Sequence, residues 1–339
     1  MAEGPAPSGV KRLPLGKIPI KVLDETVLRL TGARSDKLVA PPRAGLDFAA
    51  VKIGDKYLLT SADPITGVSE NIGAYAVMVS ANDVATSGNR PQFAEVVILL
   101  PEGSSDSELA KIARQVHDAA LKAGITILGG HTEVAPGIGH PILTVTVFSV
   151  VDRFVTSGGA QEGDTMMMTK TAGLEGTAEL AWEHRFRAGE VRASTIGKAR
   201  RLVERIDVTS EAVAAFDTGK VHAMHDCTEG GVVGAAFEMS LASGLGFVLD
   251  GGAVPVAPET REICDALSID PLQLIGSGAL LLAVAPGGEA AVERALRAVC
   301  EVTRVGRFIR SGRSVVRRGG STLALNEAPQ DELWRVLSP

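Results

Sequence analysis

The sequence predicts a mixed α/β (α+β) fold in two domains. The chain has 339 residues, which suggests two domains at roughly 150 residues each. Strand-like apolar runs are mixed with helix-period runs in both halves, as in α/β or α+β domains. Between the halves, the glycine-rich stretch TSGGAQEG (156–163) is the best linker candidate. We therefore expect a first domain at 17–155 and a second at 156–339. Residues 1–16, with three prolines and three glycines, should form a flexible leader.

In the first domain, the clearest element is a helix at 107–123. Its apolar residues recur every three or four positions, and Gly124 follows as a natural C-terminal cap. Apolar spacing predicts two further helices at 18–30 and 72–84. Strands are expected where Val, Ile and Leu are dense, at 49–53, 57–60, 96–100, 125–128 and 142–151.

The second domain mixes strands and helices in the same way. Apolar periodicity predicts helices at 175–187, 195–206, 232–242 and 289–300. Apolar runs predict strands at 166–169 and 279–285, followed by short strands over 302–325 that SGR and RGG turns separate. Helices and strands in both halves are the basis for the predicted fold class.

Composition excludes several classes of function. Lys and Arg total 34 against 40 Asp and Glu, so the net charge is −6, which argues against binding nucleic acid through its phosphates. No apolar run approaches the roughly 18 residues that span a bilayer. The first 20 residues also lack the apolar core of a secretion signal. The odd, widely spaced cysteines 227, 264 and 300 are typical of reduced thiols. We expect a cytoplasmic protein that binds neither nucleic acid nor membrane.

The chain carries acidic residues at strand ends and in glycine-rich loops. Asp47 lies in AGLDFAAV, Asp63 in SADPITG, Asp83 in ANDVATSG, Glu133 in GGHTE and Asp226 in HDCTEGG. One such residue is usually a turn or capping carboxylate, but five in one chain favour a shared cation. Oxygen ligands suit Mg²⁺, which commonly also holds phosphate oxygens. Walker, dinucleotide-binding, nucleophile-elbow and HExxH motifs are all absent from the sequence.

These motifs, in this order, resemble the AIR synthase superfamily, which includes PurM, HypE, ThiL and SelD. Asp47 in GLDFAAV resembles the GDDAAV motif, and Asp63 in DPIT resembles the second acidic strand end. Asn82–Asp83 in ANDVATSG resembles NDIAAMG, the most specific match. Gly129–Gly130 resembles the GGD or GGE loop, and Asp226 the HDxTxGG loop of the second domain. The context of these motifs is most similar to HypE-like members.

The resemblance implies a PurM-like fold, with an N-terminal sheet at the core of a homodimer and a C-terminal α/β sandwich. It implies ATP bound between the domains and across the dimer, with Mg²⁺ bridging the phosphates. The metal ligands would be Asp47, Asp63, Asp83, Glu133 and Asp226. The residues at the phosphates would be Asn82, Gly129, Gly130, Thr228, Gly230 and Gly231. Those expected to take part in catalysis are Asp83, His131 and Lys170.

Five residues can be interpreted in a second way. His131 stands where PurM, HypE and ThiL have an acid, while SelD has a similar GGH. It would bind a cation poorly or donate to phosphate, with Glu133 supplying the charge, or be a hydrogen-bonded loop histidine. Lys170 would contact phosphates or be a solvated surface lysine. Cys227 would be a nucleophile or a small buried residue. His222 and His225 should point to opposite faces of a strand, which argues against zinc.

The expected activity is Mg²⁺- and ATP-dependent phosphorylation of an amide, carbonyl or phosphate oxygen on a small molecule or carrier protein. The leader has no Cys, unlike SelD. The end, DELWRVLSP, has no terminal Cys to carry a carbamoyl group as in HypE, since the last cysteine is Cys300. One alternative is therefore a non-catalytic partner or scaffold in a maturation complex. Another is a thiamine-monophosphate-type kinase.

Overall fold

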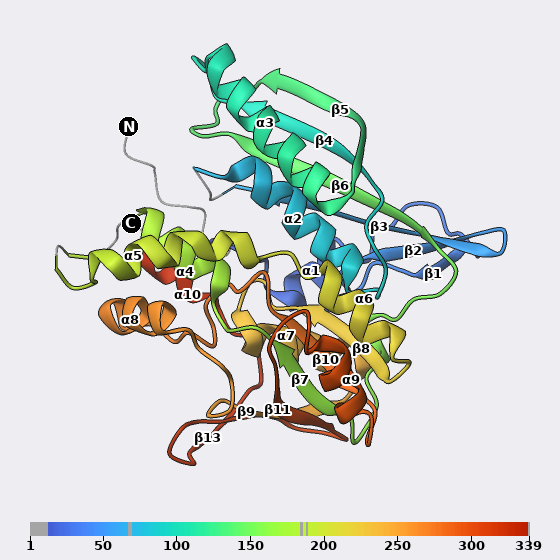
Figure 1. Cartoon of the computed structure of the whole chain (residues 1–339). Coiled ribbons are helices and arrows are strands. Elements are labelled where there is room, and N and C mark those ends of the chain that lie inside the picture. The colour runs from blue at the N-terminus through green and yellow to red at the C-terminus, as the bar shows by residue number, and fades with distance from the viewer. Residues whose placement is uncertain (1–12, 67–69, 184–185, 188, 338–339) are drawn as a thin grey trace, which may run out of the picture.

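The computed structural model describes residues 13–66, 70–183, 186–187 and 189–337. Two sheets with their helices make up the chain, one from each half of the sequence (Figure 1). Most of the predicted flexible leader, residues 1–12, lies outside the described residues. In the described part of the chain, no helix combines the length and apolarity needed to cross a bilayer.

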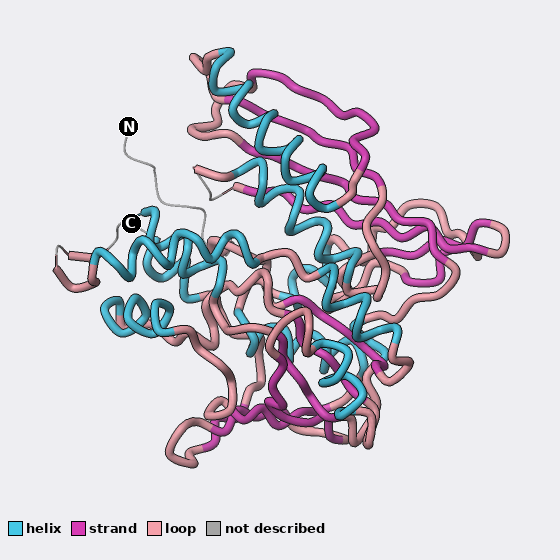
Figure 2. The backbone as a smooth tube through the Cα atoms, viewed as in Figure 1, coloured by secondary structure: helices cyan, strands magenta, loops and turns pink. Residues whose placement is uncertain are grey.

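The first sheet has six strands in the order β1-β2-β3-β6-β4-β5. They are β1 (Leu38–Ala40), β2 (Ala49–Ile53), β3 (Lys56–Ile65), β4 (Phe93–Leu100), β5 (Thr126–Val134) and β6 (Ile142–Val151). All neighbours are antiparallel except β4 and β5. Figure 2 shows α2 (Ile72–Ala85) and α3 (Asp106–Ala123) as cyan helices lying along this magenta sheet. The short helix α1 (Ile20–Thr26) precedes it.

Helix α2 joins the two halves of the molecule. It contacts β3, β6 and α3 of the first half and α6 and β8 of the second. All of its residues except Ala74 are buried, which explains why apolar residues surround the helix rather than forming one stripe. Its C-terminal end, with Asn82 and Asp83, therefore lies at the junction of the two halves.

The second sheet has seven strands in the order β13-β12-β9-β11-β7-β10-β8. They are β7 (Thr165–Thr169), β8 (Val221–Asp226), β9 (Gly246–Asp250), β10 (Leu280–Val284), β11 (Val302–Ile309), β12 (Arg313–Val316) and β13 (Thr322–Ala324). Every residue of β10 is fully buried, because both faces of this part of the sheet are covered. Along β7, Met166 and Met168 enter one hydrophobic core, and Met167 enters another.

The second half has seven helices among its described residues. They are α4 (Leu174–Glu183), α5 (Ala193–Arg200), α6 (Thr209–Asp217), α7 (Gly231–Ser243), α8 (Pro258–Leu267), α9 (Glu289–Leu296) and α10 (Glu332–Leu337), with a 3₁₀ turn η2 at Arg201–Arg205. Helices α4, α5, α8 and α10 share a hydrophobic core of their own, beside the sheet. Helix α7 lies with one core, and α6 with α9 lies over the other. Sequence periodicity did not predict α6, α8, α10, β1, β8 or β9.

The predicted linker is a packed segment. Its 3₁₀ turn η1 (Ser157–Gly159) contacts α7 and β8, and Ser157 is fully buried. A Cβ on Gly159 would lie 2.2 Å from the His222 carbonyl oxygen, and one on Gly158 would lie 2.9 Å from the Ala242 carbonyl oxygen. The glycines therefore allow this segment to pack closely against α7 and β8 of the second half.

Strand β5 corrects the prediction for GGHTE. The expected strand stops at residue 128, with a loop after it, but β5 continues to Val134. Backbone pairing with β4 runs to Leu100 and Val134, and it crosses a register shift near Glu95. A Cβ on Gly130 would lie 1.8 Å from the Val96 carbonyl oxygen, so this glycine serves a close strand contact.

Candidate metal and phosphate site

Four aspartates from distant parts of the chain lie together at the junction of the two halves. Asp47 precedes β2, Asp63 lies in β3, Asp83 near the end of α2, and Asp226 at the end of β8. Burial raises the pKa of Asp83 well above its usual range, and the negative charges of the other three aspartates raise it further. Asp83 is hydrogen-bonded to Asp63, and the Ser61 hydroxyl donates to Asp83 Oδ2 at 2.5 Å. The four carboxyl groups form one electrostatic unit, called here the acidic cluster.

The acidic cluster fits a divalent cation. Asp226 is 1% exposed, and its Oδ2 has no hydrogen-bond partner among the described residues. Burial and the negative charges of Asp47 and Asp63 raise the pKa of Asp226, and His225 lowers it. The net result is a pKa of about 8. Like-charged carboxylates in a buried site need a cation to stay ionised. Carboxylate oxygens are the donors that Mg²⁺ prefers, so these residues suit that ion.

A histidine that the motif comparison did not select braces the acidic cluster. His225 Nδ1 forms a close ion-pair contact with Asp47 Oδ1, and His225 Nε2 hydrogen-bonds to Glu238 Oε2 at 3.1 Å. Burial alone would lower the His225 pKa, but Asp47 and Glu238 raise it to about 10, so the ring is an imidazolium. Asp47, His225 and Asp226 place ligand atoms within 4.8 Å of one another. Both ring nitrogens of His225 face carboxylates, Asp47 on one side and Glu238 on the other, so His225 braces Asp47.

Asp47 is held from two sides. Besides the contact from His225 to Oδ1, the Ser157 hydroxyl donates to Asp47 Oδ2 at 2.9 Å. Glu238 lies about two turns into α7. Burial would raise the pKa of its carboxyl, but Lys17 and His225 lower it to about 2. Lys17 and Glu238 are thus part of the site, and only their three-dimensional contacts reveal them, because neither lies in a motif.

The backbone N–H groups in the loop after β8 donate hydrogen bonds to acceptors within the protein. The Gly230 N–H donates to Asp331 Oδ2 at 2.6 Å, and the Gly231 N–H donates to the Thr228 carbonyl at 2.9 Å. The Thr228 N–H itself donates to the Asp226 carbonyl at 3.0 Å. The sequence predicted that these residues face phosphate, and in this structure the carboxylate of Asp331 takes that place at the α7 N-terminus. Burial raises the pKa of Asp331 to about 6, while its backbone hydrogen bonds oppose the shift.

Asn82 is fully buried at the domain junction. Its Nδ2 donates to the Ile206 carbonyl at 2.7 Å, and its Oδ1 accepts the Val208 N–H at 3.0 Å. The structure thus engages this amide with backbone of the second half. The expected contact with a phosphate or a neighbouring carboxylate is not what the structure describes.

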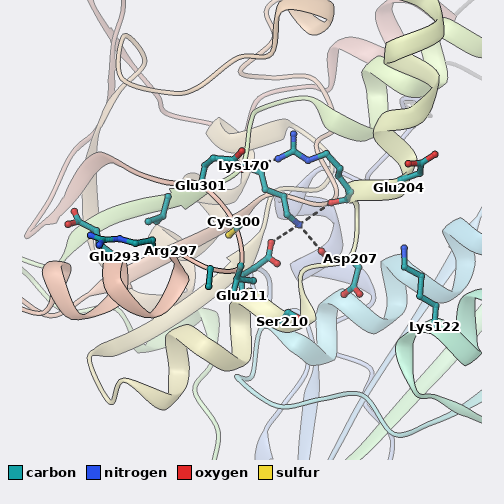
Figure 3. Close-up of a pocket in the computed structure, with 14 residues that line it drawn as sticks. Lys122, Lys170, Glu204, Asp207, Ser210, Glu211, Glu293, Arg297, Cys300 and Glu301 are labelled. Carbon is teal, nitrogen blue, oxygen red and sulfur yellow. Dashed lines mark hydrogen bonds and ion pairs between the residues drawn. The ribbon is translucent and has the colours of Figure 1, made fainter.

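Lys170 is neither a surface lysine nor a neighbour of the acidic cluster in the contacts described (Figure 3). Its Nζ donates to the carbonyls of Arg205 at 3.0 Å and Asp207 at 2.7 Å, and it pairs with Glu211 at 2.6 Å. The side chains of Lys170 and Glu211 are 8% and 4% exposed. Lys170 lines a cavity of about 850 Å³ together with Cys300, Lys122 and Arg297. Its three acceptors leave no donor free for phosphate.

His131 and Glu133 lie on an exposed edge strand. All nine residues of β5 are exposed, and β5 ends the sheet (Figure 1). Gly130 stands in register with Asp63 across β4 and β6, three strand spacings or about 14 Å away. His131 Nε2 and Glu133 Oε2 contact each other at 3.2 Å in solvent. Within one chain, the residues of GGHTE therefore do not join the acidic cluster.

The structure favours a small buried residue at Cys227 and gives His222 and His225 different partners. Cys227 is 1% exposed, and burial, with Asp226 and Asp47 nearby, raises its thiol pKa, which makes it a poor nucleophile. All three cysteines carry free thiols. His222 contacts Asp164 at 3.0 Å, whereas His225 faces Asp47 and Glu238, so the two rings serve different sites.

The fold and the acidic cluster define a mixed α/β protein of two halves, with four aspartates gathered at their junction. Residues 45–151 match the family model of the AIR synthase related protein, N-terminal domain, and residues 161–319 match that of the C-terminal domain. The chain belongs to the AIR synthase related proteins, as its motifs predicted.

Two relatives of the chain are named carbamoyl dehydratase HypE. Carbamoyl dehydratase HypE of Cupriavidus necator is 30% identical over 261 residues, covering 73% of this chain and 70% of that protein. Carbamoyl dehydratase HypE of Escherichia coli is 28% identical over 253 residues, covering 71% of this chain and 72% of that protein.

Solved structures confirm the predicted fold class. The chain resembles one in a HypE–HypF complex with a TM-score of 0.74 and 18% identity, covering 90% of this chain and 99% of that one. It resembles a ThiL complexed with AMPPCP and TMP with a TM-score of 0.68 and 20% identity, covering 84% and 90%. At these identities, the likeness shows the fold.

Proposed function

We propose that this protein is a Mg²⁺-dependent, ATP-using enzyme of the HypE type. It would transfer the γ-phosphoryl group to an amide, carbonyl or phosphate oxygen of a small molecule or carrier protein. The observation that carries the proposal is the convergence of four aspartates, with Asp226 Oδ2 buried and unpartnered among the described residues. The relatives named carbamoyl dehydratase, one of them 30% identical, support the reaction class.

The geometry suits phosphoryl transfer. This reaction depends on positioning and on neutralising the charge that spreads over the phosphoryl oxygens, which bound Mg²⁺ would supply. The chain's own part is to hold Asp47, Asp63, Asp83 and Asp226 in place, with His225 and Ser157 fixing the two oxygens of Asp47. An amide oxygen is a poor leaving group, whereas its phosphate ester leaves readily, so phosphorylation enables dehydration of a carbamoyl group.

We also propose a homodimer that covers β5. This edge strand exposes backbone and the apolar side chains of Ile127, Leu128 and Val134, next to Phe93 of β4. Exposed apolar edge strands readily pair with another chain, and a second copy offers the same surface. In such a dimer, His131 and Glu133 of one copy would approach the acidic cluster of the other, as the family resemblance implies. The free thiols favour a reducing, cytoplasmic setting.

Calorimetric titration with AMPPCP, with and without Mg²⁺, tests the nucleotide site. We expect binding in the micromolar range that requires Mg²⁺ and is lost in Asp83→Asn. Asp118→Asn, in an exposed position of α3, is the matched control and should bind like wild type. Binding without Mg²⁺, or unchanged binding in Asp83→Asn, would contradict a metal-bridged site. If AMPPCP does not bind under either condition, the result favours a non-catalytic partner protein. A thiamine-monophosphate-type kinase would be recognised by product analysis, because its acceptor would retain the phosphate.

A further inference from the structure

The segment before α1 is tied to the loop that carries Asp226. The Lys17 N–H donates to Glu229 Oε1 at 2.7 Å, and Trp334 Nε1 of α10 donates to the same oxygen at 2.6 Å. Gly16 has a φ of +82°, and a Cβ there would lie 2.2 Å from Glu229 Oε1, so glycine is needed at this position. Both ends of the described chain thus meet at Glu229, which fixes the backbone of Lys17. The end of the predicted leader is therefore packed.

The Lys17 side chain begins a line of charged contacts that ends in the acidic cluster. Lys17 Nζ lies 2.5 Å from Glu238 Oε1, and Glu238 Oε2 accepts from His225 Nε2 at 3.1 Å. His225 Nδ1 then makes an ion-pair contact with Asp47 Oδ1. Lys17 is 47% exposed, while the other three side chains are at most 8% exposed. Positive and negative groups alternate from solvent to the buried Asp47.

The buried Glu238 carboxylate depends on both of its cationic partners. Without Lys17, the charge of Glu238 would be balanced by His225 alone, which would draw the ring toward α7 and loosen its contact with Asp47. Groups behind a metal ligand typically change metal affinity by 10- to 100-fold, because they fix the ligand's orientation. A change at Lys17 can therefore alter the affinity of the acidic cluster for a cation.

We propose that Lys17 is a positioning residue, which acts through Glu238 and His225 to hold the Asp47 carboxylate in the orientation that a divalent cation needs. This inference rests on the proposed function, since it assumes that the acidic cluster binds such a cation. It also replaces Lys170 as the lysine that serves the site, because Lys170 is engaged by Glu211 and two carbonyls.

Mn²⁺ titration followed by electron paramagnetic resonance, without nucleotide, tests the proposal. We expect Lys17→Met to weaken Mn²⁺ binding about tenfold and Lys17→Arg to retain most of it. Lys21→Met, an exposed lysine of α1, is the matched control and should bind like wild type. A purely electrostatic role predicts the opposite sign, since removing a positive charge near four carboxylates would tighten cation binding. Unchanged or tighter binding in Lys17→Met would therefore overturn the proposal.

A double-mutant cycle tests the route through Glu238. If Lys17 acts through Glu238, then Lys17→Met should add almost nothing to the loss seen in Glu238→Gln. Losses that simply add would show that Lys17 acts by another path and would overturn the proposal. A wild-type protein that binds no Mn²⁺ would remove the proposed function together with this inference. Wild-type binding with an unaffected Lys17→Met would remove the inference alone.

Discussion

Burial without a positive partner raises the pKa values of Glu175 and Glu179, two residues outside the acidic cluster. Glu175 and Glu179 are one turn apart on α4, 4% and 6% exposed, and each has an oxygen without a hydrogen-bond partner among the described residues. Burial raises the pKa of Glu175 to about 7. Burial, together with the charge of Glu175, raises that of Glu179 to about 8. In an unfolded chain, glutamate titrates near roughly pH 4.3, so folding makes both groups hold their protons more tightly.

This shift predicts a pH-dependent stability. Between roughly pH 4.3 and 8 the folded state binds more protons than the unfolded state, so the free energy of unfolding falls as pH rises through this range. The glutamine of Glu179→Gln resembles a protonated glutamate, so this variant should not lose stability at position 179 as the pH rises. We expect it to raise the melting temperature at pH 8.5 by about 5 °C and to change it little at pH 5. Glu102→Gln, in an exposed turn, should change neither. An equal effect of Glu179→Gln at both pH values would contradict this account.

At the scale of elements, local patterns predicted the bounds of two strands that have neighbours on both sides, and they failed at the edge strand β5. The strands at 49–53 and 142–151 have the predicted bounds, because alternating burial repeats in their sequences. In β5 the two glycines of GGHTE resemble a loop, yet parallel pairing with β4 carries the strand through them. The helix at 107–123 was predictable because its signals are local, including the Ser105–Glu108 capping box and Gly124.

The exposed edge of β5 gives a prediction for that element. Leu128 is 58% exposed on β5, and the proposed homodimer would bury it, so Leu128→Glu should place a charge in an apolar interface. We expect analytical ultracentrifugation to show a dimer for wild type and mostly monomer for Leu128→Glu. Leu323→Glu is the matched control, since Leu323 is 38% exposed on β13 of the second sheet, and the variant should stay dimeric. A wild-type monomer, or a dimer in both variants, would argue against pairing through β5.

At the scale of the whole molecule, the candidate site could be predicted only as far as motifs reach. Asp47, Asp63, Asp83 and Asp226 follow each other in a recognisable order, and the fold brings them together. The brace of the site could not be predicted, because Lys17 and Glu238 are 221 positions apart and neither lies in a motif. Such contacts depend on how the two halves pack, which periodicity and local spacing do not encode.

That packing depends on the segment that links η2 to α6. Asn82 of the first half bonds Ile206 and Val208, and Lys170 bonds the carbonyls of Arg205 and Asp207, so four consecutive residues are held from two sides. Asn82→Ala leaves a buried carbonyl and a buried N–H without partners, which should lower the free energy of unfolding by about 2–5 kcal/mol.

Urea unfolding measures this loss, and Asn326→Ala, an exposed position, should unfold like wild type. If Asn82 instead contacted phosphate, Asn82→Ala would weaken AMPPCP binding and leave the urea midpoint unchanged. A lower urea midpoint with nucleotide affinity retained in the folded fraction would place Asn82 among the residues that join the two halves. The acidic cluster draws ligands from both halves, so the junction that Asn82 secures is also what holds Asp83 beside Asp226.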